Sequence, residues 1–400
     1  MSRRALICFW DGHLGVAPSV VSAIRLLAER GYAVDVVARD TGDSFSDVTA
    51  LPNAVTIVSP RAPSIRLGGL RSLPGPAGQL MRLVALALDR RYFTAACRRV
   101  ASGKNYDLAI GVDMFGLIAA DAAAEVSSIA RLTNWSLEMY FRATLSNPLL
   151  RAAKRREIAI SRRCELIFIQ DADRARSLAA ENGLPMDRFA FVPNAPAGFP
   201  VHTQSGFLRG HLGIAADRQI VLHAGMIHDD VCAMDLAASA ATWPERYCLV
   251  FHERAFRDAT DPYLQKIIAA SAGRVVLSLR PVPLEKVDDV FASGWAGLVF
   301  YTDSQGPNFT EVAMASGKLA FYLRNGVPVV VNALPSLVRL IERWGCGVVA
   351  SDPSAIAAAL DTIAADHEGF SARARACFAA EFDFRPFFLR ALEKIGLDER

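Results

Sequence analysis

Residues 316–331 (SGKLAFYLRNGVPVVV) constrain the fold of this chain more than any other stretch. Apolar side chains at three- and four-residue spacing predict a helix over residues 318–325 with one apolar face. Gly326 suits the left-handed conformation that ends a helix, and Pro328 cannot continue one. The β-branched run at 329–331 is typical of a short strand that is buried on both faces, as in a parallel sheet.

The amino end of this predicted helix is a candidate anion site. It follows a polar, turn-rich loop at residues 305–311 (QGPNFTE). The first amide groups of a helix lack intrahelical partners, so a helix that begins at the carboxyl edge of a parallel sheet attracts anions. Ser316, Gly317 and Lys318 occupy this end, and the Lys318 ammonium stands in the first turn, within reach of a diphosphate. The alternative is a surface lysine beside an ordinary helix cap.

An alternation of strands and helices extends over the rest of the chain. Residues 4–10, a helix that starts at Pro18, and residues 33–38 form a first strand–helix–strand unit, which predicts a parallel sheet. Residues 193–206 are typical of an interdomain linker. Further strands are predicted at 55–58, 108–112, 130–132, 166–169, 189–192, 220–224, 247–252, 274–278 and 297–301. The 400 residues therefore predict an α/β chain of two doubly wound domains with a cleft between them.

Residues 316–329 resemble the donor-site segment of GT-B fold glycosyltransferases, of the kind grouped with family 4. Four other fragments resemble landmarks of the same group and occur in the same order: 106–113 (YDLAIGVD), 135–140 (WSLEMY), 192–194 (VPN) and 297–301 (GLVFY). The resemblance extends over roughly the whole chain and concerns architecture more than substrate.

The resemblance implies both an architecture and an activity. It implies a Rossmann-like acceptor-binding domain over 1–197, a Rossmann-like nucleotide-sugar-binding domain over 206–383, and a final helix within 384–400 that packs back on the first domain. It also implies transfer of a sugar from a UDP- or GDP-sugar to a hydroxyl of a glycan or lipid-linked acceptor. Retention at the anomeric carbon, no metal and no separate cofactor are further implications, and bacterial polysaccharide or lipid-linked glycan synthesis is the expected setting.

A departing nucleoside diphosphate carries charge that must be stabilised as the glycosidic bond breaks. Lys318 is expected to do this together with Arg254 or Arg280, each of which follows a predicted strand of the second domain. Either arginine is also compatible with an ordinary surface position.

The donor's ribose or sugar hydroxyls are assigned to Glu311, with Asn308 and Thr310 as substitutes. Relatives often carry a second glutamate eight positions after the first, where this chain has Leu319, or three residues after the lysine, where it has Phe321. The departure puts ribose recognition in doubt rather than the fold.

Three residues are expected on the acceptor side of the cleft. Gly15 lies in the first strand-to-helix loop, where a glycine lets substrate approach the backbone, and His13 stands at the tip of that loop. Glu138 follows a first-domain strand and is expected to orient an acceptor hydroxyl. The alternatives are a tight turn, a solvated histidine and a helix N-terminal charge, respectively.

Several site classes are not supported by the sequence. It contains no HExxH motif, no CxxC pair among its seven cysteines and no metal-binding DxD motif in the second domain, so no metal site is predicted. The letters of DxD occur at residues 171–173, in the first domain. The GxGxxG fingerprint of dinucleotide-binding proteins and the GxSxG motif of serine hydrolases are absent as well.

The charge of the chain is uneven between its halves. Residues 1–200 hold 25 Lys and Arg against 18 Asp and Glu, whereas the whole chain has a net charge of only +3. The basic segments 61–99, including Arg61, Arg66 and Arg71, and 151–163 are expected to contact anionic phospholipid or a lipid-diphosphate acceptor, with solvated helix faces as the alternative. No nucleic-acid module is recognised. The prediction is a cytoplasmic protein at the inner face of the cytoplasmic membrane, without a signal peptide or spanning helix.

Two other classes of function remain open. A GT-B fold sugar-nucleotide epimerase or hydrolase would use the same cleft but needs acid–base groups near the anomeric carbon, where His13 and Glu138 are the candidates. A non-catalytic nucleotide-sugar-binding or scaffold protein is the other class, suggested by Phe321 and the missing second glutamate.

Overall fold

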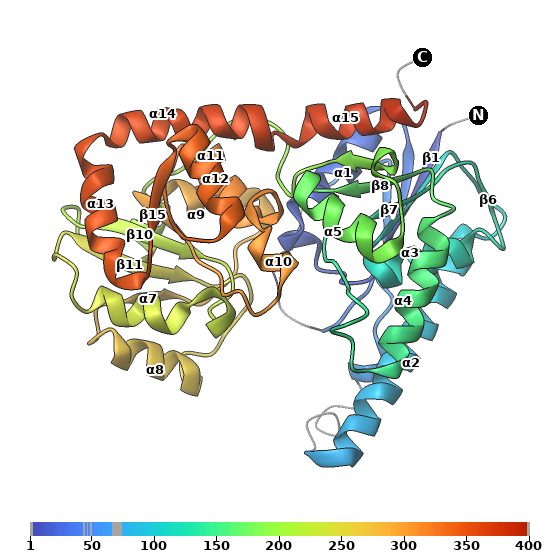
Figure 1. Ribbon diagram of the computed structural model, residues 1–400, viewed down its shortest axis with the longest axis horizontal. Coiled ribbons are helices and arrows are strands. Elements are labelled where there is room, and N and C mark those ends of the chain that lie inside the picture. Colours follow the sequence, from blue (N-terminus) through green and yellow to red (C-terminus); the bar gives the residue numbers. More distant parts are fainter. Residues whose placement is uncertain (1–2, 43–44, 46, 49, 66–73, 398–400) are drawn as a thin grey trace.

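The computed structural model describes residues 3–42, 45, 47–48, 50–65 and 74–397. Two parallel sheets, one in each half of the chain, form two lobes (Figure 1). Helices cover both faces of each sheet, so the predicted α/β architecture of two doubly wound domains is confirmed. The predicted boundaries of the domains stay predictions.

The first sheet has seven parallel strands in the order β3-β2-β1-β5-β7-β8-β9. The strands are β1 (Arg4–Phe9), β2 (Ala33–Ala38), β3 (Val55–Val58), β5 (Leu108–Val112), β7 (Leu132–Trp135), β8 (Leu166–Ile169) and β9 (Phe189–Phe191). A separate pair joins β4 (Asn105–Tyr106) and β6 (Ser128–Ile129). The helices of this half are η1 (Leu14–Val16), α1 (Pro18–Glu29), α2 (Gly75–Ala101), α3 (Asp113–Ala123), α4 (Pro148–Ser161), α5 (Ala172–Asn182) and η3 (Met186–Arg188).

The second sheet has six parallel strands in the order β12-β11-β10-β13-β14-β15. They are β10 (Gln219–Ala224), β11 (Tyr247–His252), β12 (Val276–Ser278), β13 (Ala296–Val299), β14 (Val329–Asn332) and β15 (Gly347–Ala350). The helices are α6 (Phe207–Leu212), η4 (Asp229–Val231), α7 (Ala233–Ala240), α8 (Pro262–Ala270), η5 (Leu284–Lys286), α9 (Val287–Ala292), α10 (Pro307–Thr310), η6 (Ala313–Ala315), α11 (Gly317–Arg324), α12 (Pro335–Trp344), η7 (Pro353–Ala355), α13 (Ile356–Ala365), α14 (His367–Cys377), η8 (Phe378–Phe382) and α15 (Phe384–Lys394).

The last helix lies on the lobe formed by the first half of the chain (Figure 1). Phe384 and Phe388 of α15 are fully buried and stack on Trp135 of β7 with ring centroids 5.9 and 6.0 Å apart. These side chains belong to the same hydrophobic cluster as β1, β2 and α1. The chain therefore crosses between the lobes twice, once in each direction.

Several predicted strands begin or end up to three residues away from the observed ones. The strand predicted at 130–132 is found as β7, where the polar pair Thr133 and Asn134 obscured a largely buried segment. The helix α2 begins at Gly75, and Pro76 lies in its first turn, where the missing N–H costs nothing. Arg66 and Arg71, assigned to a basic loop, lie outside the described residues, whereas Arg61 pairs with Asp40 in a β-bridge.

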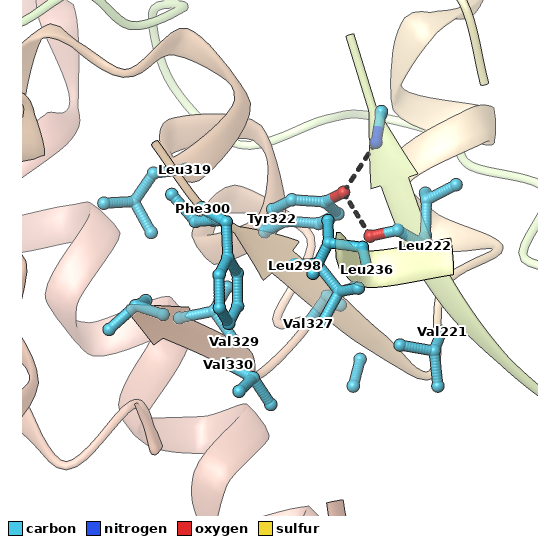
Figure 2. Packing of buried hydrophobic residues seen from close by; sticks show 14 of the residues in the cluster. Val221, Leu222, Leu236, Leu298, Phe300, Leu319, Tyr322, Val327, Val329 and Val330 are labelled. Carbon is cyan, nitrogen blue, oxygen red and sulfur yellow. Dashed lines mark hydrogen bonds between the residues drawn. The ribbon is translucent and has the colours of Figure 1, made fainter. Parts of the chain in front are cut away.

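Tyr322 fixes the helix α11 to the second sheet. Its ring is fully buried among Leu298, Leu319 and Val329, and its hydroxyl bonds two backbone groups of β10 (Figure 2). The Ala224 N–H donates to Tyr322 Oη at 3.0 Å, and Oη donates to the Leu222 carbonyl at 2.6 Å. These two hydrogen bonds hold α11, the helix that carries Lys318, against the carboxyl end of β10.

Replacement of Tyr322 by phenylalanine is expected to destabilise the fold by about 1–3 kcal/mol, because the buried Ala224 N–H loses its acceptor. Urea unfolding monitored by circular dichroism measures this. The control is Tyr263→Phe, whose hydroxyl bonds Asp229 at an exposed position and should change stability little. Equal stability of the two variants would contradict this role for Tyr322.

Candidate functional site

A pocket with a volume of about 440 Å³ lies between the two lobes. From the first lobe it is lined by the ends of β1, β5 and β7 and by the start of α1. From the second lobe it is lined by residues that follow β10, β11 and β13 and by the amino end of α11. These are the carboxyl ends of parallel strands, where doubly wound folds bind their ligands.

The amino end of α11 opens onto this pocket. Ser316 is the N-cap, and its Oγ accepts a hydrogen bond from the Leu319 N–H at 3.3 Å. Ser316 Oγ also bonds Tyr301 Oη at 2.8 Å. Gly317 faces Pro18 and Asn194 of the first lobe, which a Cβ at this position would meet at ordinary van der Waals distances of 3.5 Å and more. The cap uses one of the free amides of the helix and leaves the others directed at the pocket.

Lys318 lines the pocket and forms no ion pair with any acidic side chain that the structure describes. Its Nζ is shielded from solvent and has no hydrogen-bond partner among the described residues. The ammonium lies 4.6 Å from the centroid of the Tyr301 ring, a cation–π contact that compensates only part of the lost hydration. Burial, followed by the charge of Arg254, lowers the pKa of Lys318 to about 7. A buried cation in this state is prepared to receive an anion.

A second cation and an aromatic contact form one wall of the pocket. Arg254 follows β11, and its guanidinium lies 5.6 Å from the Phe45 ring centroid. Phe45 comes from the first lobe and forms an antiparallel bridge with Ala255. The His13 ring lies against Phe45 with centroids 4.0 Å apart and the planes tilted by 39°, and its Nε2 is 3.3 Å from Thr41 Oγ1. His13 and Gly15 both line the pocket, on the side of the first lobe.

Carboxylates gather at the opposite end of the pocket. Glu138 lines it together with Asp11 and Asp113. Asp113 has a left-handed backbone, with φ of 58°, and its Oδ1 accepts the N–H groups of Leu137 at 2.7 Å and Glu138 at 2.9 Å. Loss of hydration among protein groups raises the pKa of Asp113, which is buried, and also that of Glu138, which keeps an exposed surface in the pocket. Strained backbone and raised carboxyl pKa values are typical of functional sites.

Arg174 and Asn308 join the two lobes beneath the pocket. Asn308 pairs with the Met139 backbone through two hydrogen bonds of 2.9 Å, like one residue of a β-ladder. The Arg174 guanidinium, only 1% exposed, donates to the Leu137 carbonyl at 2.7 Å and to Asn308 Oδ1 at 3.2 Å. In Figure 1 the short helix α10, which carries Asn308, lies between the lobes and next to α5.

Three of the predicted donor residues lie outside the pocket lining. Glu311 is turned toward α5, where its two carboxylate oxygens accept from Ser177 Oγ at 2.9 and 3.1 Å. Thr310 Oγ1 bonds the Gly306 carbonyl within its own loop. The guanidinium of Arg280 lies 6.0 Å from the Phe256 ring on the surface. The structure thus assigns Glu311 to a contact between the lobes rather than to a ligand-facing position.

Apolar side chains line the part of the pocket next to α9 and α11. They include Val287, Val290 and Phe291 of α9 and Phe321 of α11. The rings of Phe291 and Phe321 stack with their centroids 5.0 Å apart. Phe321 occupies the position at which the sequence resemblance suggested a glutamate. This part of the pocket is suited to the face of a flat or weakly polar group.

The sequence indicated Lys318, Ser316, Gly317, Arg254, Glu138, His13, Gly15 and Asn308, and the structure brings these together around the pocket. It did not indicate Arg174, because neither of the two arginines within residues 171–176 (DADRAR) has a distinguishing pattern. Asp113, at the end of the predicted strand 108–112, has the same two readings as Glu138 from the sequence, a carboxylate facing the cleft or a helix N-terminal charge. In the described part of the chain, no three His, Cys, Asp or Glu side chains are grouped so as to hold a metal ion, and no helix is long and apolar enough to span a bilayer.

No family model and no curated protein sequence matches this chain. Solved structures match over nearly the whole length. A sucrose-phosphate synthase from Thermosynechococcus elongatus superposes with a TM-score of 0.70 at 16% identity, over 99% of this chain and 98% of its own. The Anabaena protein HepE in complex with UDP-glucose gives 0.67 at 15% identity, over 98% and 99%. A trehalose-phosphate synthase from Burkholderia vietnamiensis gives 0.60 at 13% identity, over 99% and 98%.

Proposed function

We propose that this chain, which has the GT-B fold, is a glycosyltransferase that uses a nucleoside diphosphate sugar as donor. The observation that carries the proposal is the Lys318 ammonium, which is buried at the amino end of a helix in an interdomain pocket and has no acidic partner among the residues that the structure describes. The structural neighbour HepE was crystallised with UDP-glucose, which supports a donor of this class.

The proposed donor lies with its diphosphate against the amino end of α11. Lys318 and the free amides of α11 bind the phosphate oxygens, and Arg254 approaches from the end of β11. As the bond between the anomeric carbon and the diphosphate breaks, negative charge builds up on the leaving oxygen. Cations already fixed in a water-poor pocket stabilise that charge without reorganising.

The nucleoside is assigned to the apolar part of the pocket and the transferred sugar to the carboxylate end. Val290, Phe291 and Phe321 offer an apolar surface to the base and ribose. Asn308 is assigned to the sugar end, where a hydrogen bond to the Met139 carbonyl fixes its side chain. Ribose recognition by Glu311 would require the Glu311 carboxylate to give up its hydrogen bond from Ser177.

The acceptor is proposed to enter from the first lobe, beside His13, Gly15 and Glu138. The raised pKa of Glu138 suits a group that exchanges a proton or a hydrogen bond with an acceptor hydroxyl. Retention at the anomeric carbon, with the departing phosphate as proton acceptor, is part of the proposal. So are a glycan or lipid-linked acceptor, a role in bacterial polysaccharide synthesis and a position at the inner face of the cytoplasmic membrane.

The proposal is tested by isothermal titration of the full chain with a panel of UDP- and GDP-sugars, followed by assays for free sugar and for transfer. Binding of at least one nucleotide sugar, with transfer to an added acceptor, is the expected result. Binding followed by hydrolysis or epimerisation alone would favour catalysis by Glu138 and Asp113 acting on water or on the sugar itself. Absence of binding by the whole panel would contradict the proposal.

The affinity for a nucleotide sugar is expected to fall as the pH rises above 7. Lys318 has a pKa of about 7 in the empty pocket, and a bound diphosphate raises it. Below pH 7 the ammonium is present before and after binding, so the affinity is constant. Above pH 7 binding requires uptake of a proton, and Kd increases by up to about tenfold per pH unit until the pKa of the complex is reached.

Titration calorimetry with UDP-glucose from pH 6 to pH 9 measures this dependence. The Lys318→Arg variant is the control, because a guanidinium does not titrate in this range and its Kd should be constant. A wild-type Kd that does not change between pH 6 and pH 9 would exclude Lys318 as the titrating group.

A further inference from the structure

The long helix α2 carries an unusual line of exposed apolar side chains. Leu80, Val84, Leu88 and Tyr92 follow each other at four-residue spacing and are 60%, 39%, 43% and 47% exposed. Residues at this spacing form one ridge on a helix. No other helix or strand in the described ranges carries more than one exposed large hydrophobic side chain. We call these four residues the α2 ridge.

The ridge faces away from the lobe. On the opposite face of α2, Ala85 is buried, and Phe93, Ala96 and Cys97 pack into the core cluster that contains Leu6 and Cys8 of β1. Figure 1 shows the amino-terminal half of α2 extending beyond the rest of the first lobe. Solvent-exposed leucines at regular spacing on a projecting helix indicate a surface that binds another apolar phase.

The charges of α2 favour a negatively charged partner. The helix contains five arginines (Arg82, Arg90, Arg91, Arg98 and Arg99) and one acidic residue, Asp89. Asp89 is buried and bonds the Ser64 N–H at 2.8 Å and Arg39 at 3.4 Å, so it does not offset charge at the surface, whereas Arg98 pairs with the exposed Glu125 at 3.1 Å. Four of the arginines lie in the carboxyl-terminal half, after the leucines. The helix is therefore apolar along its projecting half and basic nearer the lobe.

We propose that the α2 ridge docks the protein on an anionic phospholipid bilayer. The leucines and Val84 enter the boundary between head groups and acyl chains, while Tyr92 and the following arginines lie among the phosphates. The apolar side chains at the projecting end of α2 would meet the acyl chains, and the arginines nearer the lobe would meet the negatively charged head groups. This is the order of the two layers in an anionic leaflet. This inference concerns the surface alone and stands whether or not the chain is a glycosyltransferase.

The same helix is coupled to the pocket through one aromatic contact. Phe93, on the buried face of α2, packs edge-on against Trp10 at 5.4 Å, and Trp10 precedes Asp11, which lines the pocket. The ridge and these pocket residues therefore belong to the same lobe, the one to which the proposed function assigns the acceptor. An acceptor that carries a lipid tail fits this arrangement.

The test is flotation of the full chain with vesicles of phosphatidylcholine containing about 30% phosphatidylglycerol, at about 0.1 M salt. The expected result is binding to these vesicles, much weaker binding to pure phosphatidylcholine, and a reduction of roughly tenfold or more in the Leu80→Asp/Leu88→Asp variant. Because both leucines are exposed, the variant should keep the wild-type melting temperature. The matched control is Val201→Asp, at a side chain that is 87% exposed and far from α2 in sequence, which should float like the wild type.

A second variant separates charge from apolar contact. Arg91→Glu/Arg99→Glu should reduce binding to anionic vesicles and leave the weak binding to neutral vesicles unchanged. The proposal is overturned if the wild type does not float with anionic vesicles, or if the leucine variant floats as well as the wild type. It is also overturned if the wild type is a dimer without lipid and the leucine variant a monomer, since the ridge would then bind a second copy of the chain.

Discussion

Replacement of Lys318 by methionine is expected to weaken nucleotide-sugar binding by about a hundredfold, equivalent to about 3 kcal/mol, without loss of the fold. In the wild type the ammonium is buried and its Nζ has no hydrogen-bond partner in the described part of the chain, so its charge is available to the ligand. Methionine keeps the length and most of the volume of the side chain but removes that charge. Transfer activity should fall at least as much as binding, because the charge acts on the departing diphosphate.

The same substitution is expected to raise the melting temperature. Burial lowers the pKa of Lys318 from 10.5 in the unfolded chain to about 7. At pH 6 the folded protein therefore holds a charged ammonium in a buried site, which lowers the free energy of unfolding. Between pH 7 and pH 10.5 the unfolded chain binds more protons than the folded one, so wild-type stability rises with pH and the advantage of methionine shrinks. A stabilising substitution that removes function is the pattern of a binding site rather than of a structural residue.

Differential scanning calorimetry at pH 6 and titration calorimetry with the preferred nucleotide sugar measure the two effects. Lys266→Met is the matched control, because this lysine is exposed on α8 and should change neither quantity. If Lys318→Met binds the donor as tightly as Lys266→Met does, the ammonium has no part in donor binding. If it instead lowers the melting temperature by several degrees, Lys318 is a structural residue.

Replacement of Arg174 by methionine is expected to cause the largest loss of stability, about 3–5 kcal/mol at pH 8. The Arg174 guanidinium is almost fully buried and donates hydrogen bonds to Leu137 and Asn308, one in each lobe. Its charge also lowers the pKa of Glu138, Asp171 and Glu311. Without it, the half-buried Asp171 and Glu311 lose the cation that offsets their charge, whereas Glu138, which is exposed, keeps the charge of Arg254.

The pH dependence distinguishes this charge effect from a simple loss of packing. Loss of hydration raises the pKa of Glu138 and Glu311 above their usual values, so both take up protons as the pH falls. The folded variant then gains protons that the unfolded chain does not yet bind, and the loss of stability should be smaller at pH 5 than at pH 8. Urea unfolding at the two pH values measures this. Arg176→Met, on the exposed face of the same helix and paired with Asp173, is the control.

A loss that is equal at pH 5 and pH 8 would show that Arg174 acts by packing alone. A loss no larger than that of Arg176→Met would show that the contacts of Arg174 across the two lobes add little to stability.

The sequence was informative where function depends on a local pattern. The spacing from Ser316 to the strand β14 predicted a helix, its end and a buried strand, and α11 and β14 occupy these positions. Lys318 was identified because a lysine in the first turn of such a helix can reach a diphosphate bound at the free amides. The alternation of strands and helices is also a local pattern, and it predicted the two doubly wound sheets.

The sequence was uninformative where two distant segments meet. Glu311 is held by Ser177 and Asn308 by Met139, each across more than a hundred residues, and no local pattern records either pairing. Arg174 was overlooked for this reason, and the donor role assigned to Glu311 remains a prediction that its observed contact does not support. The ridge on α2 was indicated only in part, because exposure of its leucines depends on how far the helix extends beyond the lobe.

The account depends most directly on the contact between Lys318 and a diphosphate. The decisive measurement is a crystal structure of the chain with its preferred nucleotide sugar or with UDP. The account predicts a phosphate oxygen within about 2.7–3.1 Å of Lys318 Nζ, with the nucleoside against Phe291 and Phe321. A nucleotide bound elsewhere, with Lys318 Nζ still without a partner in the pocket, would contradict it.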